Sequence, residues 1–369
     1  THFVLLFSGS LDMEPTLNNY SCTLSPGMIH APAASAPEYG FPGLFFLLPE
    51  NLDPGTVYTI NLNGSFKDCT GQSAVLRSVQ FGLPSEPEPS DIVITEIMFN
   101  PRSDQTEFIE VYNRSTAIVD LKNIIVARAG PDGVITAYSD QQDLSYWLFP
   151  DHFAVFSADE QQFTRSWPKS DPGNIVSRPD WPALVSEETQ LLLLDRHQRI
   201  LETVVYNPDW QYPYLNGEKG YSLERLDFEG SGTDRSNWFS AAAASGGSTP
   251  GETNSVTQSG QTDDNQQFIL DPWAGYAAAS TDMIRLTLRY RFADAGWFMR
   301  IKVYNSSGQL TRDLFPYANA AAEGSVSWDG LDNARRMVPD GIYLIVIDYF
   351  HPMGRKGRWK KACALARDY

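Results

Sequence analysis

A two-residue hydrophobic rhythm over residues 92–121 constrains the fold of this chain more than any other feature. The first run, Ile92–Met98, is apolar on both faces, and the second run, Glu107–Asn113, alternates between two faces. Turn-forming Asn, Pro, Ser and Arg separate these runs from Ile118–Leu121. Because a period of two is typical of strands and a period of 3.6 of helices, the segment predicts β-structure, with the first run as a central sandwich strand.

The size and composition of the chain favour several packed domains. Its 369 residues predict roughly two to three domains, and a hydrophobic content of 42% is enough to form real cores. No apolar run approaches the roughly 18 residues of a membrane helix, so we expect no membrane span. The chain begins at Thr1 without a basic and apolar leader, so we interpret it as a piece of a longer precursor.

The net charge of -17 is unevenly distributed. Residues 1–90 carry -6, residues 91–260 carry -13 and residues 261–369 carry +2. An acidic surface repels phosphate, so we expect no nucleic-acid partner. The exception is the basic run 355–361. It is typical of a solvated turn and an edge strand protected by lysines, and the alternative is a patch for an anionic partner.

Pro-rich and Gly-rich stretches divide the chain. Residues 84–90 predict a semi-rigid linker, and residues 245–264 predict a segment that is flexible or extended along a neighbouring surface. The expected domains are 1–83, 91–255 with a long loop-rich insertion at 127–188, and 268–369 after a linker at 256–267.

The middle segment resembles the bacterial lamin-tail domain. The residues that carry the resemblance are Thr95-Glu-Ile97, Glu107–Asn113, Phe149–Phe156, Thr189–Asp195, Val204–Tyr206, Gly220–Arg225 and Ser248–Ser255. The resemblance implies an immunoglobulin-like sandwich from a large exported protein. It implies no reaction.

The two flanking segments resemble other exported modules. Leu52–Ile60 with Asp68-Cys-Thr-Gly71 is similar to the bacterial Ig-like domains of surface-layer proteins. Val326–Gly330 with Val338–Tyr343 resembles the Ig-like module of flagellar hook-capping proteins. In this last segment, the alternation Ile284, Leu286, Leu288, Tyr290 predicts a half-buried strand, and the apolar run Ile342–Tyr349 predicts a central strand.

Together these features predict an all-β chain of three tandem immunoglobulin-like β-sandwiches. We expect a non-catalytic array for adhesion, spacing or anchoring in the periplasm, on the cell surface or outside the cell, with a protein or polysaccharide of the cell surface as partner. One alternative is the accessory region of an extracellular nuclease or glycanase. Another is a carbohydrate-binding module that uses aromatic loops.

No catalytic or metal motif is apparent. The five histidines are isolated: His2, His30, His152, His197 and His351. The zinc, nucleophile-elbow and phosphate-loop spacings are absent, so we expect no catalytic residue, no metal ligand and no cofactor. Calcium is the alternative, at the oxygen-rich Asp329–Asn333 or at Asp171 with Asp180. Asp329-Gly330 is also typical of a hairpin turn.

Carboxylates and aromatics are the remaining candidates. Glu96, Glu107 and Glu110 would suit a glycosidase, but ion pairs with Arg114 or Arg225, or hydrogen bonds to loop backbone, are the simpler interpretation. Exposed aromatic rings can stack on sugars, whereas the alternative is a small core beneath the insertion. The candidate ligand-binding aromatics are Trp147, Trp167, Trp181, Trp210 and Tyr212.

The three cysteines exclude a disulfide scaffold. Cys22 and Cys69 lie in the same predicted domain, and either a structural disulfide or two free thiols fits them. Cys363 is expected to be a small buried hydrophobic residue.

Overall fold

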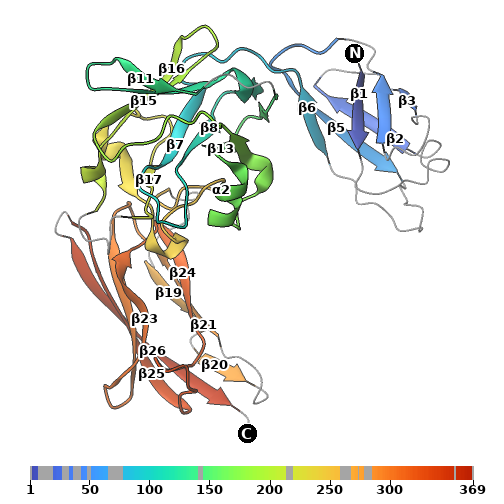
Figure 1. The fold of residues 1–369 in the computed structure, drawn as a ribbon. Helices are drawn as coiled ribbons and strands as arrows, with labels where there is room; N and C mark the ends of the chain where they lie inside the picture. The colour runs from blue at the N-terminus through green and yellow to red at the C-terminus, as the bar shows by residue number, and fades with distance from the viewer. Residues whose placement is uncertain are drawn as a thin grey trace. The chain divides into compact units, whose positions relative to one another are not determined.

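The computed structural model describes residues 2–6, 20–26, 33–35, 43–47, 51–64, 78–139, 144–212, 219–257, 267–272, 274–277, 285–352 and 355–367. Of these, only the backbone is described for 2–6, 20–24, 33–35, 43–47, 62–64, 244, 274–277 and 367. Nearly all of the regular structure consists of β-strands arranged in several sheets (Figure 1). This confirms the predicted all-β class. Within the described residues, no helix is long and apolar enough to cross a membrane.

The chain forms two compact units. The first comprises residues 1–91, 113–124 and 142–152, and the second comprises 92–112, 125–141 and 153–369. The division into three domains stays a prediction.

The first unit contains two three-stranded sheets and a short strand pair. One sheet has the order β1-β4-β3 and the other β2-β5-β6. The strands are β1 (His2–Leu6), β2 (Tyr20–Ser25), β3 (Ala33–Ser35), β4 (Gly43–Leu47), β5 (Val57–Gly64) and β6 (Val79–Gly82). The pair consists of β9 (Val119–Asp120) and β12 (Trp147–Leu148). The predicted turn at Pro54-Gly55 is present, since Gly55 adopts a φ of 81° that suits glycine.

Residues 92–257 of the second unit contain a six-stranded and a four-stranded sheet. The orders are β14-β13-β8-β7-β17-β18 and β11-β10-β15-β16. The first set is β7 (Ile92–Met98), β8 (Phe108–Asn113), β13 (Phe153–Ser157), β14 (Ile175–Ser177), β17 (Leu223–Arg225) and β18 (Trp238–Ser240). The second is β10 (Ile125–Ala129), β11 (Ile135–Tyr138), β15 (Thr189–Leu194) and β16 (Ile200–Tyr206).

Strand β7, which the sequence predicts to be a central strand, lies inside the six-stranded sheet. All seven residues of β7 are buried, and the strand lies between β8 and β17. On one side β16 packs against it. On the other side Met98 contacts Phe163 of helix α2 (Glu160–Ser166), and Glu96 receives a hydrogen bond from Thr249. Because both faces are covered, a strand without exposed positions is stable here.

The insertion at 127–188 is more ordered than the predicted loop-rich stretch. It contains strands β11, β12, β13 and β14 together with α2. Asp159 caps the helix by accepting a hydrogen bond from the Gln162 amide at 2.7 Å, and Phe163 is buried beneath it. The helix is only seven residues long, so its apolar face consists of one residue and gives little periodic signal.

The C-terminal strands form a three-stranded and a five-stranded sheet around one core. The orders are β19-β21-β24 and β20-β26-β25-β22-β23. The strands are β19 (Phe268–Asp271), β20 (Ala274–Ala277), β21 (Leu286–Arg291), β22 (Phe298–Asn305), β23 (Leu310–Asn319), β24 (Glu323–Trp328), β25 (Gly341–Phe350) and β26 (Lys356–Arg367). The predicted alternation holds in the described part, since Leu286, Leu288 and Tyr290 are all buried.

Strand β25 is central in its sheet, as predicted. Only one of its faces is buried, because Ile342 and Leu344 are 64% and 36% exposed. The predicted Asp-Gly hairpin needs correction. Gly330 has the positive φ expected of an Asp-Gly turn, at 74°. The turn does not close a hairpin, because β24 pairs with β21 whereas β25 pairs with β22 and β26.

Polar contacts join the C-terminal strands to residues 240–257. Asn319, which is 1% exposed, accepts a hydrogen bond from the Ala243 amide at 3.0 Å and donates to the Ala241 carbonyl at 2.5 Å. The Ala322 amide donates to the Ser255 carbonyl at 3.0 Å. These buried main-chain contacts make the junction part of the packed structure.

Candidate functional site

Three glutamates lie close together within the six-stranded sheet. Glu96 on β7 is the register partner of Glu224 on β17, and Glu110 lies on β8, the other neighbour of β7. All three side chains are 0% exposed. The segment 248–256 contacts each of them.

The segment 248–256 donates most of the hydrogen bonds that these carboxyl groups accept. The Thr249 amide donates to Glu96 at 3.0 Å, the Gly251 amide to Glu110 at 2.6 Å and the Val256 amide to Glu224 at 3.0 Å. The Thr249 and Ser255 hydroxyls also donate to Glu224, at 2.8 and 2.7 Å. Ser222, just before β17, donates to Glu96, and Thr95 on β7 donates to Glu110. The predicted hydrogen bonding to loop backbone is therefore present.

Burial governs the protonation of this cluster. It raises the pKa of Glu110 to about 8 and the pKa of Glu224 to about 7. The pKa of Glu96 lies well above its ordinary value, first because of burial and then because Glu224 and Glu110 are close. Each carboxyl group lies next to a hydroxyl that can accept as well as donate, so the pocket accommodates a protonated carboxyl.

The cluster is a structural clamp rather than an open site. A glycosidase needs a carboxylic acid and a carboxylate that a sugar can reach. Here the main chain of 248–256 already occupies the oxygens of all three groups, and no side chain of the three is exposed. The arrangement fixes the end of the sandwich against its sheet.

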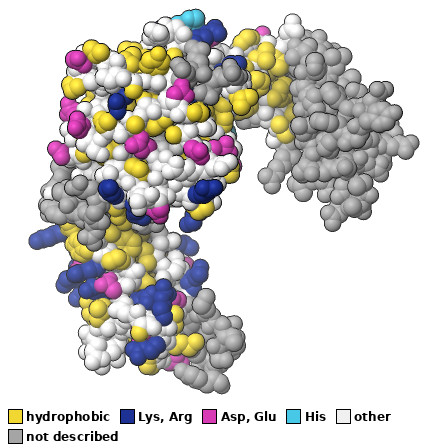
Figure 2. Space-filling model, viewed as in Figure 1, with side chains coloured by type: hydrophobic (Ala, Val, Ile, Leu, Met, Phe, Trp, Pro, Cys, Tyr) yellow, Lys and Arg dark blue, Asp and Glu magenta, His cyan; other side chains and the backbone are white. Residues whose placement is uncertain are grey.

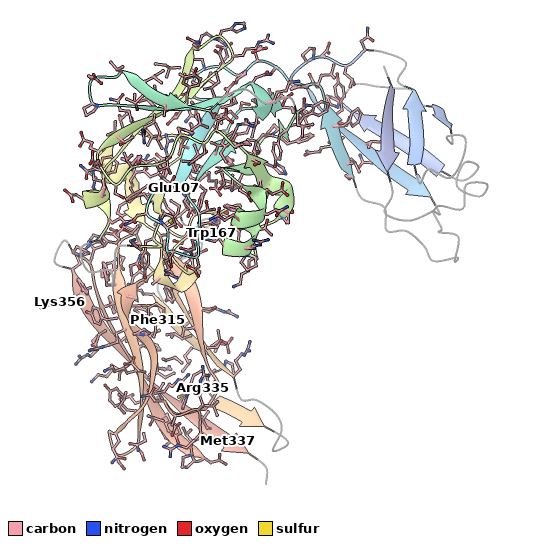
Figure 3. All side chains as sticks on the ribbon, in the orientation of Figure 1. Glu107, Trp167, Phe315, Arg335, Met337 and Lys356 are labelled. Carbon is pink, nitrogen blue, oxygen red and sulfur yellow. The ribbon has the colours of Figure 1, made fainter. Side chains whose placement is uncertain are left out.

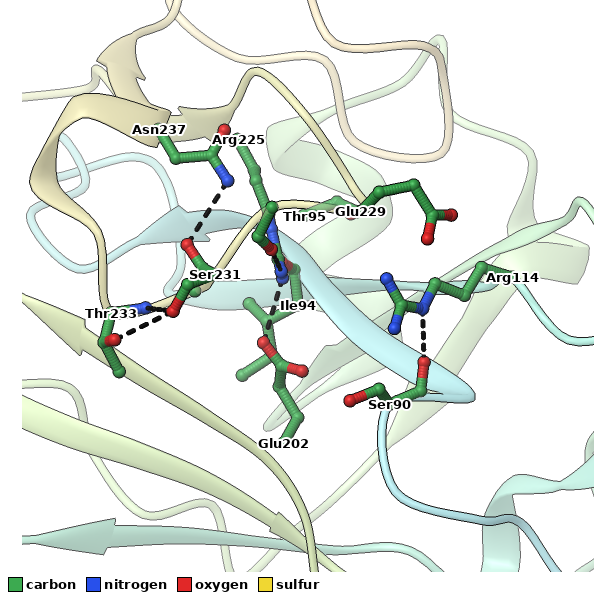
Figure 4. A network of polar contacts seen from close by, with 12 residues as sticks. Ser90, Ile94, Thr95, Arg114, Glu202, Arg225, Glu229, Ser231, Thr233 and Asn237 are labelled. Carbon is green, nitrogen blue, oxygen red and sulfur yellow. Dashed lines mark hydrogen bonds and ion pairs between the residues drawn. The ribbon is translucent and has the colours of Figure 1, made fainter.

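The arginines proposed as counter-ions do not pair with these glutamates. Arg225 is 2% exposed and its Nη1 contacts Glu202 at 2.9 Å and the Ile94 carbonyl at 3.0 Å (Figure 4). Arg114 donates from Nε to the Ser90 carbonyl at 2.5 Å (Figure 4). The prediction of a counter-ion for Glu96 or Glu110 is wrong at these two positions, since the arginines bind carbonyls and Glu202.

Glu107 and Trp181 form a contact that holds the insertion. Glu107 Oε2 accepts hydrogen bonds from Trp181 Nε1 at 3.2 Å and from the Leu184 amide at 2.8 Å. Burial raises the pKa of Glu107. Trp181 is half-buried, and its indole N–H ties this loop to Glu107.

Trp167 belongs to a core cluster under α2. Its ring lies 4.9 Å from the rings of both Phe108 and Phe163, and its Nε1 donates to Ser248 Oγ at 2.7 Å. Figure 3 shows Trp167 and Glu107 on the same sandwich. The ring is partly buried against this cluster.

The remaining candidate aromatics each have their own contacts. Arg235 lies over the ring of Trp210, at 5.5 Å from the centroid. The ring centroids of Tyr212 and Phe298 lie 5.3 Å apart at the junction with the C-terminal strands. Burial raises the pKa of the Tyr212 hydroxyl. Trp147 in the first unit is 42% exposed and pairs with Asp120 in the strand ladder. The predicted sugar-stacking role of these aromatic residues stays a prediction.

The candidate calcium ligands contact arginines or turn amides. Asp329 pairs with Arg335 at 3.2 Å and Asp332 with Arg336 at 2.9 Å. Asp171 caps a short 3-10 helix through the Gly173 amide. In the part of the chain that the structure describes, no three His, Cys, Asp or Glu residues are grouped so that they could hold a metal ion.

The structure describes the side chains of some of the histidines and cysteines but not of others. His152 and His351 contact the carbonyls of Pro150 and Ala295, at 2.7 and 3.0 Å. Cys363 is buried and free, as expected. The side chain of Cys22 and all of Cys69 lie outside the described residues, as do the side chains of His2 and His30.

Sequence reasoning missed Glu224 as the third member of the cluster. The sequence does place Glu224 within a strand-like run, between Leu223 and Arg225, and a segment rich in Ser and Thr follows it. The pairing that places it beside Glu96 joins strands 128 positions apart in sequence. No local pattern encodes that register.

Comparisons with known proteins give distant matches. No family model matches the chain, and no curated protein matches it. Among solved structures, a DUF4876 family protein from Bacteroides thetaiotaomicron is 13% identical, with 60% of this chain and 87% of that chain covered and a TM-score of 0.26.

Two further solved structures come from Porphyromonas gingivalis. Dimeric latent PorU is 13% identical, with 100% of this chain and 30% of that chain covered and a TM-score of 0.22. PorZ, a surface component of the type-IX secretion system, is 11% identical, with 84% and 43% covered and a TM-score of 0.22. At these TM-scores the likeness carries no conclusion about this chain.

Proposed function

We propose that this chain is a non-catalytic structural and interaction region of an exported protein, and that residues 92–257 and 285–367 act as one spacer. The observation that carries the proposal is the clamp. The clustered glutamates Glu96, Glu110 and Glu224 are fully buried and hydrogen-bonded to the segment 248–256. That segment leads directly into the junction with the C-terminal strands through Ser255.

The physical role of such a region is to hold loops and faces at a fixed separation. Packed sandwiches are rigid, whereas flexible linkers between domains allow independent motion. The buried Asn319 and the Ala322 amide replace flexibility with specific hydrogen bonds at the junction. Adhesion, anchoring and spacing all need this property.

An activity screen with glutamine variants tests the proposal. The full chain is incubated with polysaccharide and nucleic-acid substrates beside Glu96→Gln and Glu110→Gln, which preserve side-chain shape. The proposal expects no turnover by any of the three proteins. A hydrolysis that wild-type protein performs and either variant loses would overturn it and support the extracellular hydrolase instead.

A further inference from the structure

The outer face of the five-stranded sheet is amphipathic in a way that the sequence did not predict. Its residues form cross-strand rows over β22, β25 and β26. The rows are Arg300–Asp348–Arg358, then Lys302–Val346–Lys360, then Tyr304–Leu344–Ala362. Cations therefore flank Asp348 in the first row and the apolar Val346 in the second, and the third row continues the apolar floor.

A shallow groove of about 480 Å³ follows this floor. Ile342, Leu344 and Val346 of β25 line it, with Arg300 on one side and Lys360 on the other. Since adjacent strands lie about 4.8 Å apart, backbone positions on β22 and β26 flank β25 at roughly 10 Å from each other. The opposite face of these strands is the buried core, so only this face is open.

The face is positively charged although the whole chain is acidic. Arg300, Lys302, Arg358 and Lys360 oppose the carboxylates Asp348 and Asp313, which leaves four positive charges against two negative ones. Residues 285–367 hold 14 basic and 7 acidic residues, a net of +7 within a chain of -17. Figure 2 shows Lys and Arg side chains gathered over these C-terminal strands.

The basic run near the C-terminus is thus part of a larger arrangement. Lys356, Arg358 and Lys360 alternate along β26 on the outer face, and β22 adds two more cations to the same face. Strand β26 pairs with β20 only at residues 364–367. Protection of a strand edge explains exposed lysines on β26, but it does not explain cations on β22 or an exposed apolar strand between them.

We infer that the outer face of β22, β25 and β26 binds an acidic polysaccharide, a chain of sugar rings that bears carboxylate or sulfate groups. The apolar faces of the rings would lie on the floor around Leu344 and Tyr304. Acidic groups that project from both edges of such a ribbon would meet cations on both sides.

The geometry favours this ligand over three other partners. A second copy docked face to face would bring like charges together, which costs association energy. An acidic peptide strand directs alternate side chains up and down, so it does not present acids at both edges above an apolar underside. Single-stranded nucleic acid binds on open aromatic platforms. In the three rows only Tyr304 is aromatic, and in the neighbouring row the ring of Phe350 is already stacked on Phe298 and Tyr317.

The experiment is calorimetric titration of the full chain with polygalacturonate, heparin and neutral dextran at low and at physiological salt. The variant Lys360→Glu reverses one exposed charge on the face. Lys169→Glu reverses one exposed charge in the loop after α2 and matches the change in net charge. A third variant, Leu344→Gln, removes apolar character from the floor. Circular dichroism shows whether each variant folds.

The inference predicts saturable binding of polygalacturonate or heparin that weakens as salt rises. Lys360→Glu should weaken this binding at least tenfold and Leu344→Gln several-fold, whereas Lys169→Glu should leave it within twofold. Carboxylate and sulfate ligands are distinguished by which of the two polymers binds more tightly. Dextran should not bind.

Four results would overturn the inference. The first is that neither acidic polymer binds at low salt, and the second is that Lys169→Glu weakens binding as much as Lys360→Glu. The third and fourth are that poly-L-glutamate or a thymidine oligonucleotide binds as tightly as the acidic polysaccharides. The last two would assign the face to an acidic protein or to nucleic acid. None of these outcomes depends on whether the buried glutamates are catalytic, so the proposed function is tested separately.

Discussion

At the scale of single residues, the protonation of Glu110 links the clamp to pH. Burial raises its pKa from 4.5 to about 8 in the folded protein. Between these values the folded state holds a proton that the unfolded state has lost, so unfolding releases a proton. The contribution of Glu110 to the free energy of unfolding is therefore fully present below about pH 4.5 and is lost as the pH rises toward 8.

We expect the free energy of unfolding to fall by at least about 1 kcal/mol between pH 5 and pH 8. Urea denaturation followed by tryptophan fluorescence measures it. Glu110→Gln imitates the protonated acid, because its amide can donate to Thr95 while its oxygen accepts from the Gly251 amide. This variant should show a flatter pH dependence. A wild-type stability that rises over this range would contradict the assignment.

Arg225 offers a second test at the residue scale. Its ion pair with Glu202 is almost completely buried, at 2% and 7% exposure. Arg225→Met removes the cation but leaves the buried carboxylate, which should cost roughly 3–5 kcal/mol of unfolding free energy. The double variant with Glu202→Met should recover much of this loss.

The exposed pair of Arg335 and Asp329 is the matched control. Arg335→Met should change the free energy of unfolding by less than about 1 kcal/mol, because solvent screens exposed pairs. Equal losses of unfolding free energy in Arg225→Met and Arg335→Met would mean that the burial of the ion pair does not determine the size of the loss.

At the scale of elements, the segment 248–256 depends on Thr249. Its hydroxyl contacts Glu224 at 2.8 Å and lies 3.5 Å from Glu96. Thr249→Val keeps the shape but loses these contacts, so it should cost roughly 1–3 kcal/mol. Thr257→Val is the control, since Thr257 Oγ1 contacts only the Asn254 carbonyl among the described residues.

Hydrogen exchange of the Gly251 and Val256 amides reports the effect directly. Thr249→Val should speed exchange at both amides, and Thr257→Val should not. Unchanged protection in Thr249→Val would show that the clamp does not depend on this hydroxyl.

The strands were largely predictable from sequence because alternation is a local property. The buried faces of β21 and β22 and the central position of β7 follow from their residue patterns. The clamp was not predictable, because Glu96, Glu110 and Glu224 meet only after distant strands pair. The exposed face of β25 was not predictable either, since an apolar run does not reveal whether a second layer covers it.

At the scale of the whole molecule, the junction between residues 240–257 and the C-terminal strands determines how the spacer behaves. Asn319→Ala removes the acceptor of the Ala243 amide and the donor to the Ala241 carbonyl. Burying these groups without partners should cost roughly 1–3 kcal/mol. Thermal unfolding should then separate into two transitions, one for each side of the junction.

Native-state hydrogen exchange in increasing urea tests the central claim most directly, because it measures the free energy of opening on both sides of the junction. If residues 92–257 and 285–367 form a single rigid spacer, their core strands should open at the same free energy in wild-type protein. Opening of 285–367 at a clearly lower free energy, with 92–257 still protected, would contradict the single rigid spacer.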